Sequence, residues 1–309
     1  MRTGPYDSKA HTFGVLVLIV MFVLLGGTGG QARNKEWGAS YFPNLPVVTQ
    51  DGKELQFYDD VIKGKIVVIS FIYTSCRDLC PLTTARLGLL ADRLGDDLGK
   101  SIHLVSISVD PANDTPERLK EFASAFHSGP GWLFLTGTVE NIRAINTKLG
   151  EKMRRLDEHR NEVLVGNDLT GDWMRNSAFA QTEKLLSDVR GMDPAWRDPR
   201  AVGARVAVGE GSYPLEATRG QALFGNLCRG CHTIGGGDRV GPDLVGLSSR
   251  RSNEWAARYI MSPKQVHSEG DATAKELVGR FPRVRMPNLG LSDLDAQDLL
   301  AYIAVRSNR

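Results

Sequence analysis

The chain has 309 residues, of which 41% are hydrophobic and 24% are charged, and its formal net charge is +2 at pH 7. This composition is that of an ordinary globular protein, and the length is sufficient for two domains with separate cores. The near-neutral charge and the lack of a basic stripe give no electrostatic basis for nucleic-acid binding.

An apolar segment lies close to the N-terminus. Residues 13–27 read FGVLVLIVMFVLLGG, with Arg2 and Lys9 before them. The run is at the short end for a membrane span and suits the central part of a signal peptide, with a weak small-residue cleavage context before Arg33. We therefore expect residues 1–34 to be a signal peptide or a membrane anchor.

Short apolar runs alternate with helix-like stretches from residue 37 to 185. KIVVISFIY (65–73) and IHLVSISV (102–109) are typical of buried strands. Helical spacing follows in residues 83–95, and a further helix is expected from Pro116, with Thr115 as its N-cap. A third strand–helix unit occupies 132–150. This alternation predicts an α/β domain with helices packed on a sheet.

The pattern becomes irregular at about residue 182, and residues 186–215 are predicted to be a linker because prolines, glycines and mixed charges interrupt the apolar periodicity. Residues 216–309 contain no convincing strand. They are predicted to form a small all-α domain, with helices at 217–227, 253–261, 271–279 and 292–306.

The four cysteines fall in two tight pairs about 150 residues apart, which indicates two sites rather than a disulfide framework. The second pair lies in CRGCH, Cys228 to His232, the attachment motif of c-type haem. Cys228 and Cys231 would bond to the haem vinyl groups, and His232 would become the proximal iron ligand.

A sixth iron ligand is expected further along the chain. Met286 stands directly before Pro287, which suits a ligand held on a loop before a Ser292-capped helix, and a thioether ligand favours electron transfer. Met261 is the competing methionine, and His267 is interpreted as a surface loop histidine.

Residues 216–309 resemble the class I cytochrome c family over its full length. The resemblance implies a small all-α domain with covalent haem c and an exposed haem edge for electron exchange. Haem c is installed on the outer side of the bacterial membrane, which implies a periplasmic location, anchored or secreted. The first cysteine pair would then lie in an oxidising compartment.

The first pair, Cys76 and Cys80, is separated by three residues and follows a buried strand. A helix N-terminus at this point would lower the pKa of Cys76. Residues four apart on a helix have Cβ atoms about 5 to 6 Å apart, wider than the roughly 3.5 to 4.5 Å of a relaxed disulfide. The spacing permits a reducible disulfide or a soft metal ion. Zinc is disfavoured because the other cysteines belong to the haem motif.

Three histidines are candidate third ligands in this domain. From the residues alone, His103 in an apolar strand and His127 in a loop are structural or solvated, and His159 is an exposed histidine with no evident partner.

Three blocks in order, FIYTSCRDLCP, SISVDPANDTPERLKEF and GWLFLTGTVENI, resemble the Sco/SenC family of copper chaperones over about residues 40–185. The resemblance implies a thioredoxin-like fold with one copper ion bound by Cys76, Cys80 and His159, and it matches Asp78 to an acidic residue between the cysteines. It also implies assistance in assembling the copper centre of cytochrome c oxidase, whose copper-bearing subunit would be the partner. The segment before His159 departs from the family pattern, since Glu158 intervenes.

We therefore expect a thioredoxin-like α/β domain (37–185), a linker (186–215) and an all-α cytochrome c domain (216–309), with copper and haem c as cofactors. Three functions remain open at this point: a metallochaperone, a thiol–disulfide oxidoreductase, and an electron carrier without copper. Whether the protein is an enzyme is undecided between them.

Overall fold

The computed structural model describes residues 37–77, 79–126, 128–151, 156, 161–197 and 218–308. Among these residues no helix combines the length and the apolar composition needed to cross a bilayer. The predicted signal peptide or anchor at 1–34 lies outside the described residues, as do Asp78, His127 and His159.

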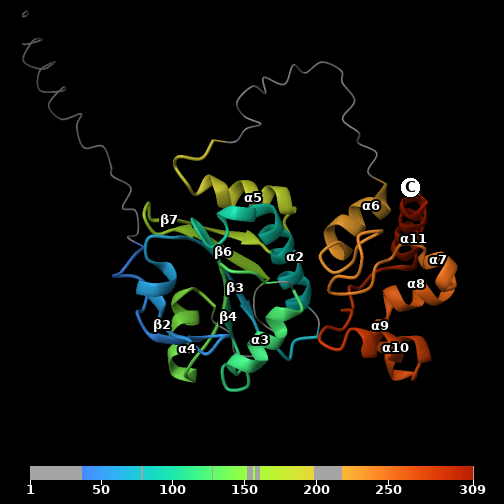
Figure 1. The fold of residues 1–309 in the computed structure, drawn as a ribbon, viewed down its shortest axis with the longest axis horizontal. Coiled ribbons are helices and arrows are strands. Elements are labelled where there is room, and N and C mark those ends of the chain that lie inside the picture. The colour runs from blue at the N-terminus through green and yellow to red at the C-terminus, as the bar shows by residue number, and fades with distance from the viewer. Residues whose placement is uncertain are drawn as a thin grey trace, which may run out of the picture. The chain divides into compact units, whose positions relative to one another are not determined.

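A seven-stranded sheet forms the centre of the first region, with the strand order β2-β1-β5-β4-β3-β6-β7 (Figure 1). Strands β3, β4 and β5 are parallel neighbours, while β6 pairs antiparallel with β3 and β7 with β6. The strands are β1 (Pro46–Thr49), β2 (Glu54–Gln56), β3 (Ile66–Ile72), β4 (Ile102–Ser108), β5 (Trp132–Thr136), β6 (Glu162–Asn167) and β7 (Asp172–Ser177).

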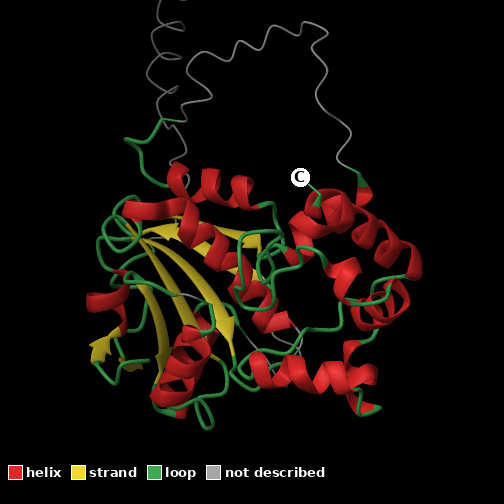
Figure 2. Ribbon diagram, turned by 45° about the vertical axis from the view of Figure 1, so that its right-hand side comes forward, coloured by secondary structure: helices red, strands yellow, loops and turns green. Residues whose placement is uncertain are grey.

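Helices cover both faces of this sheet, as Figure 2 shows. Alternate residues of β3 belong to different clusters: Ile66 and Val68 pack with residues of α2 (Leu79–Leu94), α3 (Pro116–Ser124) and α5 (Thr182–Gly191). The residues between them, Val67 and Ile69, pack with η1 (Phe57–Ile62) and α4 (Val139–Lys148). Every side chain of β3 is buried. The predicted α/β class, with helices packed on a sheet, is confirmed.

Local sequence signals account for several helix boundaries. Helix α3 begins at Pro116, and the Thr115 hydroxyl accepts a hydrogen bond from the Arg118 N–H, as predicted for an N-cap. One expectation is wrong: residues from 182 onward were expected to be irregular, yet α5 is a helix over 182–191. Its Leu185, Leu186 and Val189 are buried. The prolines that suggested a break stand after this helix and Gly191 is its last residue, while its apolar face is supported by packing rather than by a side-chain cap.

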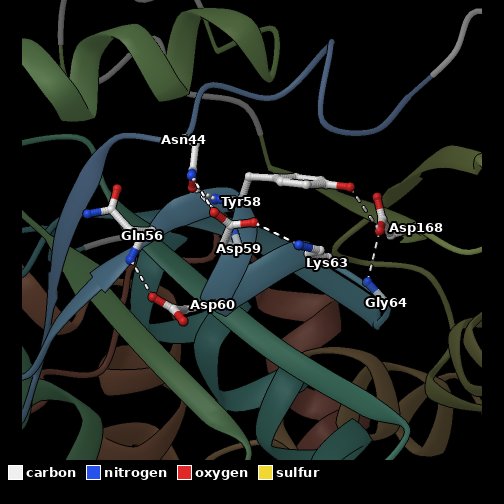
Figure 3. Close-up of polar contacts among 8 residues, drawn as sticks. All are labelled: Asn44, Gln56, Tyr58, Asp59, Asp60, Lys63, Gly64 and Asp168. Carbon is white, nitrogen blue, oxygen red and sulfur yellow. Dashed lines mark hydrogen bonds and ion pairs between the residues drawn. The ribbon is translucent and has the colours of Figure 1, made fainter.

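Helix η1 is tied to the turn between β6 and β7 (Figure 3). The Asp168 carboxylate accepts hydrogen bonds from the Tyr58 hydroxyl at 3.3 Å and from the Gly64 N–H at 2.8 Å. Burial, and then the nearby Asp168 charge, raise the pKa of Tyr58, so its phenol keeps the proton that it donates. These contacts attach η1 to the β6–β7 turn, on the face of the sheet opposite α2.

The described residues from 218 to 308 contain helices and no strand, as expected for an all-α region. Helices α6 and α11 cross closely, because Gly220 lies against the backbone of Asp298, where a Cβ atom would not fit. Ser292 caps α11 through a reciprocal capping box with Asp295. The elements are α6 (Arg219–Leu223), η4 (Phe224–Cys228), α7 (Leu247–Arg250), α8 (Asn253–Met261), α9 (Pro263–Ser268), α10 (Ala272–Arg280) and α11 (Asp293–Ser307).

Gly166 in β6 provides a test of the sheet packing. A Cβ atom at this position would overlap the Trp173 ring. We expect Gly166→Ala to lower the free energy of unfolding by roughly 1–3 kcal/mol through overpacking, as measured by urea denaturation. Gly191→Ala is the control, because its Cβ would meet no atom within 4 Å. Equal unfolding free energies for the two variants would contradict this packing.

Candidate functional site

Cys76 and Cys80 stand at the junction between a buried strand and a helix. Strand β3 ends at Ile72, the Cys76 N–H donates to the Tyr73 carbonyl at 3.2 Å, and α2 begins at Leu79. The Cys80 N–H in the first turn of α2 donates to Cys76 Sγ at 3.4 Å. Cys76 therefore lies just before the helix N-terminus, where the dipole and a backbone donor stabilise a thiolate.

The two thiols are in unequal environments. Cys80 is fully buried, whereas Cys76 keeps 7% of its surface exposed. The hydrogen bond between the two sulfurs raises the pKa of Cys80, and burial raises it further. Cys80 therefore holds its proton more tightly than an ordinary cysteine does. The pair consists of a slightly exposed sulfur beside a helix N-terminus and a fully buried sulfur.

Asp114 holds the loop that leads to Cys76. Its carboxylate is 1% exposed and accepts hydrogen bonds from the Thr74 N–H at 3.1 Å, the Thr74 hydroxyl at 2.6 Å and the Ser108 hydroxyl at 2.6 Å. Thr74 is two residues before Cys76, so these bonds fix the start of the dithiol loop to the end of β4. The sequence reasoning did not assign this role to Asp114, because nothing in a single sequence distinguishes a buried aspartate from one near a helix cap.

The described residues include no cluster of three or more histidine, cysteine, aspartate or glutamate side chains suited to a metal ion. His159, the predicted third ligand, lies outside the described residues and stays a prediction. His103 is near the start of β4, paired with Val67 at the start of β3. The cysteines follow the other end of β3. At about 3.3 Å per residue, Val67 near one end of this strand and Tyr73 just past the other are about 20 Å apart. His103 is therefore not part of the dithiol site.

The second site is a cavity of about 420 Å³ in the helical region. Cys228, Cys231, His232 and Met286 all line it, whereas Met261 does not. Burial raises the pKa of Cys228 and of Cys231 to about 12, so both sulfurs remain protonated. The predicted haem-binding residues thus meet around one cavity of a size that suits a cofactor.

The position of His232 fits the role of an iron ligand. Its Nδ1 lies 2.8 Å from the Pro242 carbonyl oxygen, so Nδ1–H donates there and Nε2 is left for the metal. Burial lowers the pKa of His232, which keeps the imidazole neutral as ligation requires. A Cβ atom on Gly241 would lie 2.6 Å from His232 Cε1, so this glycine makes room for the ring. The sequence shows Gly241-Pro242 but gives no sign of this supporting role.

His267 differs from its expected place. It belongs to α9 rather than to a surface loop, lines the same cavity, and its Nε2 lies 3.0 Å from the Tyr259 hydroxyl. Helix α9 was not expected because it is only six residues long, and Pro263 at its start resembled a loop residue.

Comparison with known protein families gives two matches. Residues 41–167 match the family described as SCO1/SenC, and residues 217–306 match the family described as Cytochrome c. The two regions are those that carry the Cys76–Cys80 pair and the Cys228–His232 motif.

Individual relatives match the first region. The SCO1 protein homolog of Bacillus subtilis is 34% identical over 119 residues, which is 38% of this chain and 60% of that protein. Protein SCO2, mitochondrial, of Saccharomyces cerevisiae is 37% identical over 92 residues, 30% of each. The chain thus spans less than two thirds of the length of these relatives. A SCO1/SenC family lipoprotein of Bacillus anthracis has a similar solved structure: 24% identity, TM-score 0.44, with 51% of this chain and 96% of that chain covered.

The buried carboxyl of Asp114 predicts a pH dependence. Burial raises its pKa above the ordinary 3.8 despite its hydrogen bonds. The folded protein then holds this proton more tightly than the unfolded chain, so the stabilising contribution is complete below that ordinary value and is lost as pH rises through the folded-state pKa.

The variant Asp114→Asn removes this titration while keeping the side-chain shape. We expect the unfolding free energy of the wild type, minus that of the variant, to decrease as pH rises above about 4. Urea denaturation at a series of pH values measures the difference. A difference that is constant or increases with pH contradicts the assignment.

Proposed function

The chain joins an SCO1/SenC domain to a cytochrome c domain, and we propose that it is a copper metallochaperone and thiol-redox protein that assists maturation of the copper centre of cytochrome c oxidase. The copper-bearing subunit of that oxidase is the proposed partner. The observation that carries the proposal is the unequal dithiol at the N-terminus of α2, with the slightly exposed Cys76 beside the fully buried Cys80.

This dithiol suits a soft metal ion that must be released again. Two thiolates and one imidazole select copper over harder ions, and the proposed ligands are Cys76, Cys80 and His159. Both sulfurs bind as thiolates, so the raised pKa of Cys80 means that binding releases a proton there. A partner with its own cysteine ligands can then take the ion through Cys76, the more exposed of the two sulfurs.

The haem site is proposed for haem c, which Cys228 and Cys231 would bind covalently and whose iron His232 and Met286 would ligate. Bound haem supplies one-electron redox chemistry. The residues of this chain orient the imidazole through Pro242, keep it neutral through burial, and present the thioether of Met286 to the same cavity.

A location on the periplasmic side of the inner membrane is part of the proposal. The support is chemical: covalent haem c is installed outside the bacterial cytoplasm, and the apolar run at 13–27 is typical of an export signal or anchor. Attachment to the membrane through residues 1–34 is proposed on the same ground.

The unequal dithiol also favours a second candidate, a thiol–disulfide oxidoreductase. In that function the Cys76 thiolate attacks a disulfide of the partner, which releases one partner thiol and leaves a mixed disulfide between Cys76 and the other partner sulfur. Cys80 then attacks the Cys76 sulfur and displaces the second partner thiol, so the partner gains two electrons as Cys76 and Cys80 become a disulfide. The two functions differ in whether they need His159.

Substitution of His159 separates these candidates. We expect His159→Ala to weaken copper binding by more than about 100-fold, since even outer-shell changes cost 10–100-fold. The rate at which the reduced dithiol reacts with a disulfide reagent should stay within about twofold. Copper titration of the reduced protein, followed by absorption and EPR spectra, measures the first quantity.

His103→Gln is the control, because His103 lies at the far end of the parallel strands. It should leave copper binding unchanged. If His159→Ala binds copper like the wild type, His159 is not a ligand; if the wild type itself binds none, the thiol–disulfide or electron-carrier function replaces the chaperone.

Met286 and Met261 form a second matched pair of variants. Met286→Ala should lower the haem reduction potential by on the order of 0.1 V, because the axial ligands set that potential over a range of about 0.8 V. Met261→Ala should leave it unchanged, since Met261 does not line the cavity. Redox titration of the haem absorption bands measures the potential of each variant. A lowered potential in Met261→Ala, with an unchanged potential in Met286→Ala, would assign the iron ligand to Met261.

A further inference from the structure

Helix α2 contributes to both sites. Cys80 stands in its first turn, and Leu82, two residues later, lines the haem cavity together with Cys231 and His232. At about 1.5 Å of rise per residue, Cys80 and Leu82 are some 3 Å apart along the helix axis. Because side chains two residues apart on a helix point to different sides of it, one turn of α2 serves the dithiol on one side and the haem cavity on another.

The packing between the two regions is close. A Cβ atom added to Gly230, between the two haem cysteines, would lie 3.1 Å from the Ala85 Cβ on α2. The hydrophobic cluster that contains Cys76 and Cys80 also contains Val240, and Cys231 packs against that cluster. Residues Trp37–Arg309 accordingly form one compact unit.

Arg86 lies at the centre of this contact. Its side chain is 5% exposed, and its guanidinium donates to the carbonyls of Ala178 at 3.0 Å, Phe179 at 3.1 Å and Ala180, all in the first region. It also donates to the carbonyl of Asn226, two residues before Cys228. A buried guanidinium needs most of its five donors satisfied, and here carbonyls of both regions satisfy them.

An ion pair between the two regions lies on the same face of the helix. Arg239 donates to the Asp92 carboxylate. The residues that contact the second region lie along one face of α2, because Ala85, Arg86 and Asp92 follow Leu82 by three, four and ten residues. Since the pair is partly exposed, we regard it as an aid to orientation rather than a source of affinity.

We propose that Arg86 is a positioning residue that holds the cytochrome c domain on this face of α2, so that the haem-attachment motif lies against the helix whose first turn carries Cys80. The partner of the haem edge is then inside the same chain. The arrangement suits exchange of one electron: haem iron(II) is oxidised to iron(III) as Cu(II) on the two cysteine sulfurs is reduced to Cu(I). The use of docking for this exchange rests on the proposed function, whereas the docking itself does not.

Small-angle X-ray scattering of the full haem-loaded chain, without copper, tests the docking. Arg86→Met removes the donors, and we expect the radius of gyration to rise by roughly a fifth as the domains separate. Arg93→Met is the control: Arg93 is on the same helix but pairs with Glu183 within the first region. It should scatter like the wild type.

Because Arg86 also donates to carbonyls of its own region, its replacement changes that region as well as the contact. A second variant therefore alters the contact from the cytochrome c domain. Gly230→Trp inserts bulk against Ala85 and should open the chain equally, while Gly225→Trp, where a Cβ meets no atom within 4 Å, should not. Circular dichroism and haem absorption confirm that each variant is folded.

Expansion in both Arg86→Met and Gly230→Trp, with compact controls, supports the docking. An expanded wild type, or either variant as compact as the wild type, overturns it. Because no copper is used, failure of the docking is distinct from failure of the copper titration of His159→Ala.

Discussion

The burial of helix α2 is the constraint on which both sites depend. Twelve of its sixteen residues are buried, including polar Thr83 and Thr84 and the charged Arg86. A helix packed only on a sheet exposes one face, so burial on this scale requires a second layer on the other side of α2. The first turn of the same helix supplies the backbone donor to Cys76. Any shift of α2 would therefore disturb the dithiol and the wall of the haem cavity together.

The two cysteine pairs differ in the groups around them although all four sulfurs are in low-polarity surroundings. At Cys76 a helix N-terminus and a backbone N–H donor favour the thiolate. At Cys228 and Cys231 burial is the largest influence, and it raises the pKa of both thiols. A soft metal ion is bound by thiolates, so the first pair is the better competitor for copper. The different environments thus keep the copper chemistry away from the haem-attachment thiols.

Sequence periodicity predicted the parallel strands β3, β4 and β5 and the helices that follow them, because β3 and β4 are uninterrupted apolar runs and α3 has both a proline and a threonine cap. The spacing of Cys228 to His232 predicted residues that the structure places around one cavity. Asp114 and Arg86 were not predicted. Their roles come from burial among carbonyls, hydroxyls and amides that are distant in the sequence, and only the tertiary fold brings those groups together. Helix α5 was missed because its stability comes from packing and not from a local signal.

A fixed interface changes what the fusion of the two domains contributes. A flexible tether of about 30 residues would raise the effective concentration of one site at the other only to the mM range, with every orientation sampled. Docking on α2 selects one orientation, and the distance between the sites is then set by a helix rather than by a linker. Since the haem exchanges one electron and a disulfide requires two, a fixed neighbouring haem matches the one-electron couple of copper better than the dithiol couple. The geometry of α2 therefore favours the copper function over the purely thiol-based one.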